Sequence, residues 1–136
     1  MTERIITVLR HHKLASACFF GTILISLARI PMGTFNEASS LDAISHFILP
    51  ASGAPLAMAL LRQVTTYPVL HPVLGVLTII TLGTTGAVIW EVFELLVDSL
   101  FGLNWQVDNL DTMLDLISGM AGSLVGGWLF MRHQAR

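Results

Sequence analysis

Four apolar segments, separated by short polar stretches, dominate the pattern of hydrophobic and polar positions along the chain. The pattern predicts helices at about 14–30, 41–62, 71–100 and 108–131. Most of these segments reach the length of about 20 residues that a helix needs to cross a bilayer. Because short loops join consecutive segments, we expect an all-α fold, a four-transmembrane-helix up-down bundle that forms one integral-membrane domain over residues 1–136.

The first apolar segment is the shortest, with seventeen residues from Leu14 to Ile30 that only Arg29 interrupts. Basic residues precede it, as they precede the apolar part of a secretory signal peptide. A cleaved signal is therefore an alternative to a membrane span. Since no clear Ala-x-Ala cleavage site follows, we favour an uncleaved first helix.

The second helix is expected to begin with a capping box, because Ser39 and Asp42 have the spacing of that motif. Pro50 and Pro55 lie within the same segment. Each proline removes a backbone donor and clashes with the preceding turn, so we expect a kink near the middle of this helix.

The composition agrees with an integral membrane protein. Hydrophobic residues make up 54% of the chain and charged residues 12%, about half of the quarter that is usual in soluble domains. The mean hydropathy is +0.73. The net charge of -2 gives no reason to expect a nucleic-acid partner, and the single cysteine, Cys18, excludes a disulfide framework within one chain.

Basic residues are distributed unevenly between the two ends of the expected bundle. One end carries Arg4, Arg10, Lys13, Arg62, Arg132 and Arg136, whereas the other end carries only Arg29. Cytoplasmic loops are enriched in lysine and arginine, so we expect both termini inside the cell. The loops at 31–43 and 101–107 would then face outward.

Acidic residues gather at the outward end. Six of the nine acidic residues of the chain lie between positions 90 and 115. They form two triplets with i, i+3, i+7 spacing, which places each triplet on one helix face. The triplets are Glu91, Glu94 and Asp98, and Asp108, Asp111 and Asp115. Asp42 and His46 share a face of the second helix at the same end.

Ionised carboxylates are costly within a membrane, and a bound cation, a basic partner or protonation compensates them. We therefore predict a metal site. Its candidate ligands are His46, Glu91, Glu94, Asp98, Asp111 and Asp115, with Asp42 and Asp108 as weaker candidates. Asp108 is equally well explained as the N-cap of the fourth helix, and Asp111 as a residue of its first turn.

Carboxylate oxygens with one imidazole suit a divalent ion, and the ion could be Mg, Mn, Ca, Fe or Zn. The Glu-x-x-His motif of di-iron bundles is missing from the acidic segment. If the protein is an enzyme, Glu91, Glu94 or Asp115 is the candidate base for a metal-activated water that attacks a lipid head group or another polar substrate.

The acidic residues are also compatible with two other functions. The acids could form a relay in an ion- or proton-coupled transport subunit, or they could pair with basic residues of a larger membrane complex. Ser118, Gly122 and Gly126 form a small-xxx-small face on which another helix can approach closely. This face is a candidate surface for a homo-oligomer.

Three separated motifs resemble the YjdF-like proteins of the bacterial inner membrane, which are loosely similar to VanZ-like membrane proteins. The motifs are Asp42-x-x-x-His46-Phe47, then Trp90-Glu91-x-Phe93-Glu94, and finally Asp108-x-x-Asp111-Thr112-x-x-Asp115-Leu116. The resemblance implies a multi-pass protein of the inner (cytoplasmic) membrane with a shared polar core. It implies no particular reaction.

Overall fold

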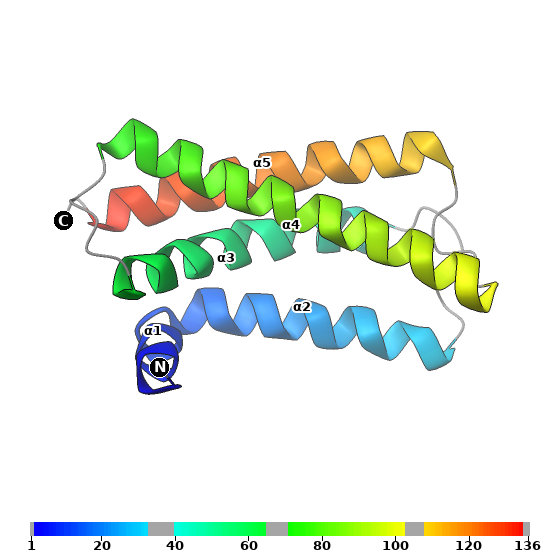
Figure 1. The fold of residues 1–136 in the computed structure, drawn as a ribbon, viewed down its shortest axis with the longest axis horizontal. Coiled ribbons are helices and arrows are strands. Elements are labelled where there is room, and N and C mark those ends of the chain that lie inside the picture. Colours follow the sequence, from blue (N-terminus) through cyan, green and yellow to red (C-terminus); the bar gives the residue numbers. More distant parts are fainter. Residues whose placement is uncertain (1, 33–39, 65–70, 103–107, 135–136) are drawn as a thin grey trace.

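The chain folds entirely into α-helices, as the sequence pattern predicts. A computed structural model describes residues 2–32, 40–64, 71–102 and 108–134 (Figure 1). Its helices are α1 (Thr2–His11), α2 (Lys13–Met32), α3 (Ser40–Val64), α4 (Pro72–Phe101) and α5 (Asn109–Gln134). The four predicted helices correspond to α2–α5, with ends that differ by no more than three residues.

Three helices contain a segment that is long and apolar enough to cross a membrane. These segments are Leu41–Gln63, Pro72–Phe101 and Asn109–His133. The apolar part of α2, Lys13–Ala28, falls short of that length. Hydropathy and length within the described residues thus identify three candidate spans rather than the four that we predicted.

Helix α1 was not predicted, because its residues are polar and basic. It is amphipathic, with Val8 buried against the bundle and charged residues such as Glu3 and Arg10 in its end turns. In Figure 1 α1 is seen nearly end-on, whereas the other helices follow the long axis of the molecule. It therefore lies across one end of the bundle.

Helices α3, α4 and α5 pack on one another, and α2 packs on α3. The N-terminal end of α1 and the C-terminal end of α5 lie at the same end of the bundle (Figure 1). Among the described residues, α2 makes no close backbone approach to α4 or α5. The fold is thus a three-helix core with α2 added along one side.

Local signals define both ends of α4. The side chain of His71 accepts a hydrogen bond from the backbone N–H of Val73, and Pro72 occupies the first turn, where its missing N–H is not needed. Gly102 ends the helix in the left-handed conformation, with φ of 65°, which is unstrained only for glycine. By contrast, the predicted capping residue Ser39 lies outside the described residues.

The two prolines of α3 face the glycines of α5. Both prolines lie inside one helix, so the carbonyl groups of His46 and Ala51 lose the N–H that residues 50 and 55 would normally donate. A methyl group built on Gly126 would overlap the Ala51 oxygen, and one built on Gly119 would lie 3.6 Å from the His46 oxygen. The backbone of α5 therefore covers the two carbonyl groups that proline leaves without a helical donor.

The same close packing bears on the predicted role of the small-residue face of α5. A methyl group on Gly122 would overlap the carbonyl oxygen of Phe47, and the hydroxyl of Ser118 donates a hydrogen bond of 3.0 Å to the Ala43 oxygen. The face formed by Ser118, Gly122 and Gly126 thus packs on α3 of the same chain. This packing gives no support to the prediction that the face joins two copies, because α3 already covers it.

We predict that Gly126→Ala lowers the free energy of unfolding by about 1–3 kcal/mol, the usual range for an added methyl group in a tightly packed core. Thermal or denaturant unfolding in detergent measures the change. Gly21→Ala is the matched control, because a methyl group there meets no atom within 4 Å. Equal stability of the two variants would contradict the close approach of α5 to α3.

Candidate metal centre

Three helices bring polar side chains to one end of the core. Helix α3 begins at this end and carries His46. Helix α5 packs parallel to α3 and contributes Asp115 one turn before Gly119, the residue that lies against the His46 backbone. Helix α4 runs in the opposite direction and contributes Glu91 and Glu94 near its C-terminal end. The register of α3 and α5 therefore decides which groups meet.

His46 is the centre of the arrangement. Its Nδ1 atom lies 3.4 Å from Oε1 of Glu91, on α4. Its Nε2 atom lies 3.8 Å from Oδ2 of Asp115, on α5, and 4.0 Å from Oδ2 of Asp42, one turn earlier on α3. One imidazole ring thus faces carboxylates from all three core helices.

These groups are shielded from solvent by the packed helices. His46, Glu91, Glu94 and Asp115 are each between 4 and 6% exposed. Ionised carboxylates at such depth require a compensating positive charge, proton or bound cation. The burial thus distinguishes these acids from a solvated surface cluster, in which water would screen the charges.

A hydrogen bond from Trp90 fixes the position of Glu94. The indole Nε1 of Trp90 donates to Oε1 of Glu94 over 2.8 Å, and the two residues are one turn apart on α4. Trp90 belongs to one of the three sequence motifs, but the sequence pattern alone assigned it no role at the site. Because a partly buried tryptophan N–H needs an acceptor, the i, i+4 spacing of Trp90 and Glu94 could have predicted this hydrogen bond.

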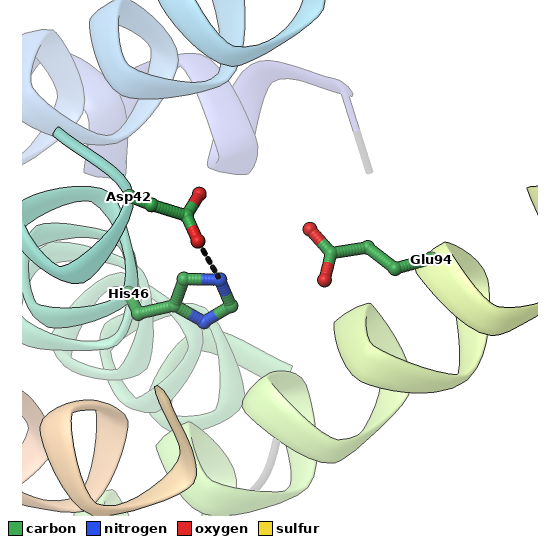
Figure 2. Close-up of side chains that lie close together, drawn as sticks. All are labelled: Asp42, His46 and Glu94. Carbon is green, nitrogen blue, oxygen red and sulfur yellow. Dashed lines mark ion pairs between the residues drawn. The ribbon is translucent and has the colours of Figure 1, made fainter. Parts of the chain in front are cut away.

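Three overlapping sets of side chains have the spacing of metal ligands. Figure 2 shows one of them, in which Glu94 from α4 points toward Asp42 and His46 of α3. Within each set, one ligand atom per residue lies within 4.8 Å of the others. The sets are Asp42, His46 and Glu94; His46, Glu91 and Asp115; and Asp42, Asp111 and Asp115.

That spacing is compatible with a shared cation. Oxygen ligands lie about 2.0–2.6 Å from Mg²⁺ or Ca²⁺, so two ligands of one ion are at most about 4–5 Å apart. The set of His46, Glu91 and Asp115 is the only one of the three in which every member is buried. It is therefore the most enclosed of the described sets.

Two candidate ligands are not brought into these sets. Oδ1 of Asp108 accepts hydrogen bonds from the backbone N–H groups of Leu110, at 2.8 Å, and Asp111, at 2.9 Å. Asp108 thus acts as the N-cap of α5, the structural alternative that the sequence offered. Asp98 belongs to none of the three sets among the described residues, and its carbonyl oxygen accepts the N–H of Gly102.

An apolar cavity of about 310 Å³ adjoins the polar cluster. It lies between α2, α3 and α4, where α2 and α4 stand apart. His46 and Trp90 line one end of it, and the rest of its wall is apolar, including Phe19, Leu49 and Gly86. The cavity thus connects the buried cluster to a space suited to a hydrocarbon chain.

Comparison with known protein families agrees with the membrane character of the helices. The family model described as "Predicted membrane protein (DUF2238)" matches residues 5–136. The chain belongs to this family. No curated protein and no solved structure matches it. Membership of DUF2238 supports the prediction of an uncharacterised membrane-protein family, without identifying the chain as YjdF-like or VanZ-like.

Proposed function

We propose that this DUF2238 protein binds one divalent metal ion through His46, Glu91 and Asp115. The observation that carries the proposal is the convergence of one imidazole and two carboxylates, from three helices, in a buried set with ligand-like spacing. Glu94, Asp42 and Asp111 surround this set and complete a carboxylate-rich shell. The donors suit Mg²⁺, Mn²⁺, Ca²⁺, Fe²⁺ or Zn²⁺.

A cation would offset the electrostatic cost of packing the acids together. Carboxylates that share a dry site repel one another, and a metal ion is the strongest local charge available to compensate them. Glu91 and Glu94 lie toward the C-terminal end of α4, where the helix dipole disfavours negative charge. These two acids therefore need a compensating cation more than acids at a helix N-terminus would.

We also propose four membrane crossings, with both termini inside a bacterial cell and the metal site toward the outer side of its inner membrane. Helix α2 runs beside α3 along the bundle (Figure 1), which supports its role as the fourth span. The end where the described termini lie carries Arg4, Arg10, Arg62 and Arg132, in keeping with the positive-inside rule.

The adjoining cavity favours an amphiphilic substrate. Its apolar wall fits a hydrocarbon chain, and its polar end at His46 and Trp90 places the head of such a molecule beside the proposed metal. Of the three candidate bases, Glu94 is not a ligand in the proposed set and would serve as the base toward a water at the metal, and the metal would supply Lewis-acid activation. A lipid head group is therefore the substrate class that we favour over a soluble polar molecule.

Metal analysis of protein purified in mild detergent without chelator tests the proposed site. We expect close to one divalent ion per chain in the wild type and loss of most of it in His46→Ala and Asp115→Asn. Asp108→Asn is the matched control, because its side chain caps α5 and lies in none of the ligand sets. This variant should keep its metal.

Unfolding temperatures of all four proteins would show whether a loss of metal reflects a loss of fold. Metal-free wild-type protein that remains folded would contradict the proposal and favour a proton relay or a basic partner. Equal metal content in all four proteins would also contradict it.

The proposed membrane topology predicts that a reporter active only outside the cytoplasm stays inactive when fused to the C-terminus. A C-terminal fluorescent protein, which folds in the cytoplasm, should be bright. The reverse pattern would show that the C-terminus lies outside and that the assigned orientation is wrong.

Filling the cavity should block lipid binding and leave the metal in place. Gly86 lines the cavity, and a side chain built there meets no atom within 4 Å. We expect Gly86→Leu to reduce labelling of α2, α3 and α4 by a phospholipid with a photoreactive acyl chain several-fold. Gly21→Leu, at an equally open position away from the cavity, should label like the wild type. Unchanged labelling of Gly86→Leu would contradict the lipid assignment and leave the proposed metal site unaffected.

A further inference from the structure

A second cavity lies at the opposite end of the bundle from the acidic cluster. Its volume is about 340 Å³, and residues of α1, the C-terminal end of α3 and the C-terminal part of α5 line it. The lining residues are Thr7, Val8, His11, His12, Ala59, Arg62, Gln63 and Phe130. The described wall contains three basic side chains and no carboxylate.

Arg62 supplies the permanent positive charge of this cavity. Its guanidinium carbon lies 5.4 Å from the centre of the Phe130 ring, and its Nη2 atom lies 3.8 Å from the sulfur of Met131. Among the described residues, no acidic side chain forms an ion pair with Arg62. Neither an aromatic face nor a thioether neutralises a guanidinium group, so its charge remains available to a ligand.

Two histidines complete the donor set. The His12 ring lies 5.6 Å from the Phe130 ring and 5.0 Å from the His11 ring. Burial, together with the nearby His11 and His133, lowers the pKa of His12 below its ordinary value. Positive charge on the neighbouring imidazole groups thus disfavours protonation of His12, and an anion beside the ring would offset that effect.

In the proposed topology the position of α1 would place the cavity at the edge of the membrane. Helix α1 lies across the bundle end, with Ile5 and Ile6 exposed on its surface and basic residues nearby, as in a helix that rests in the head-group layer. Arg4 holds α1 against the end of α3, because its Nη1 atom donates a hydrogen bond of 2.7 Å to the carbonyl oxygen of Gln63. In the proposed topology the cavity would therefore lie at the depth of lipid phosphates.

We propose that Arg62, His11 and His12 form a binding site for a phosphate group. The guanidinium and the imidazole N–H groups donate hydrogen bonds to phosphate oxygens, and the charge of Arg62 strengthens them. The phosphate belongs to an anionic lipid of the inner leaflet or to a soluble phosphate compound, which present the same oxygen acceptors. This site is separate from the proposed metal centre, and only its assignment to the inner leaflet rests on the proposed membrane topology.

Binding measurements on the full chain in detergent distinguish the two sources of phosphate. The probes are phosphatidylglycerol, phosphatidylcholine and inorganic phosphate, followed by native mass spectrometry for the lipids and calorimetry for the free ion. Arg62→Gln should weaken binding of the preferred probe about tenfold or more, as expected for loss of a charge-assisted hydrogen bond. His12→Gln should weaken this binding as well. It is the second test variant, used if Arg62→Gln does not fold.

Arg132→Gln is the matched control. Arg132 is an exposed arginine at the same end of the bundle, its guanidinium lies over Trp128, and it does not line the cavity. Selective loss of phosphatidylglycerol in the Arg62 and His12 variants would identify a lipid site, and selective loss of inorganic phosphate would identify a soluble ligand. No binding of any probe, or equal losses in the Arg62 and Arg132 variants, would overturn the proposal.

Discussion

The close approach of α3 and α5 is the constraint on which the rest of the structure depends. Pro50 and Pro55 deprive two carbonyl groups of α3 of their helical donors, and the glycine-lined surface of α5 packs against that side of the helix. Side chains larger than hydrogen would separate the two helices, and the register would no longer be fixed by backbone contact. That register places Asp115 beside His46.

The third wall of the polar cluster follows from a similar pattern on α4. Its buried face consists of Gly75, Ile79, Gly83, Ala87, Glu91 and Glu94. Small residues let α4 approach α5 closely, and Gly83 lies directly against Ser123. The same face then continues into carboxylates, so tight packing and the burial of charge are inseparable here. The proposed cation would reconcile the two, because it would allow the helices to remain close while the acids stay ionised.

The sequence predicted the long helices well, because apolar length and Gly/Pro punctuation are strong local signals. It missed α1, whose short amphipathic pattern is easily taken for a polar terminus. The small-residue face of α5 correctly indicated close helix packing, although spacing cannot say whether the partner helix belongs to the same chain. Periodicity likewise placed Glu91, Glu94 and Asp115 on common faces, but it could not show that Asp108 turns back to cap its own helix, since that depends on side-chain reach.

The coordination of a bound metal by His46 is the central claim, and pulsed electron paramagnetic resonance tests it directly. Protein loaded with Mn²⁺ should show coupling to one imidazole nitrogen, and labelling histidine with ¹⁵N should change that signal. The signal should vanish in His46→Gln and persist in His71→Gln, because His71 caps the far end of α4. A bound Mn²⁺ with no nitrogen coupling, or with coupling that survives in His46→Gln, would contradict the proposed site.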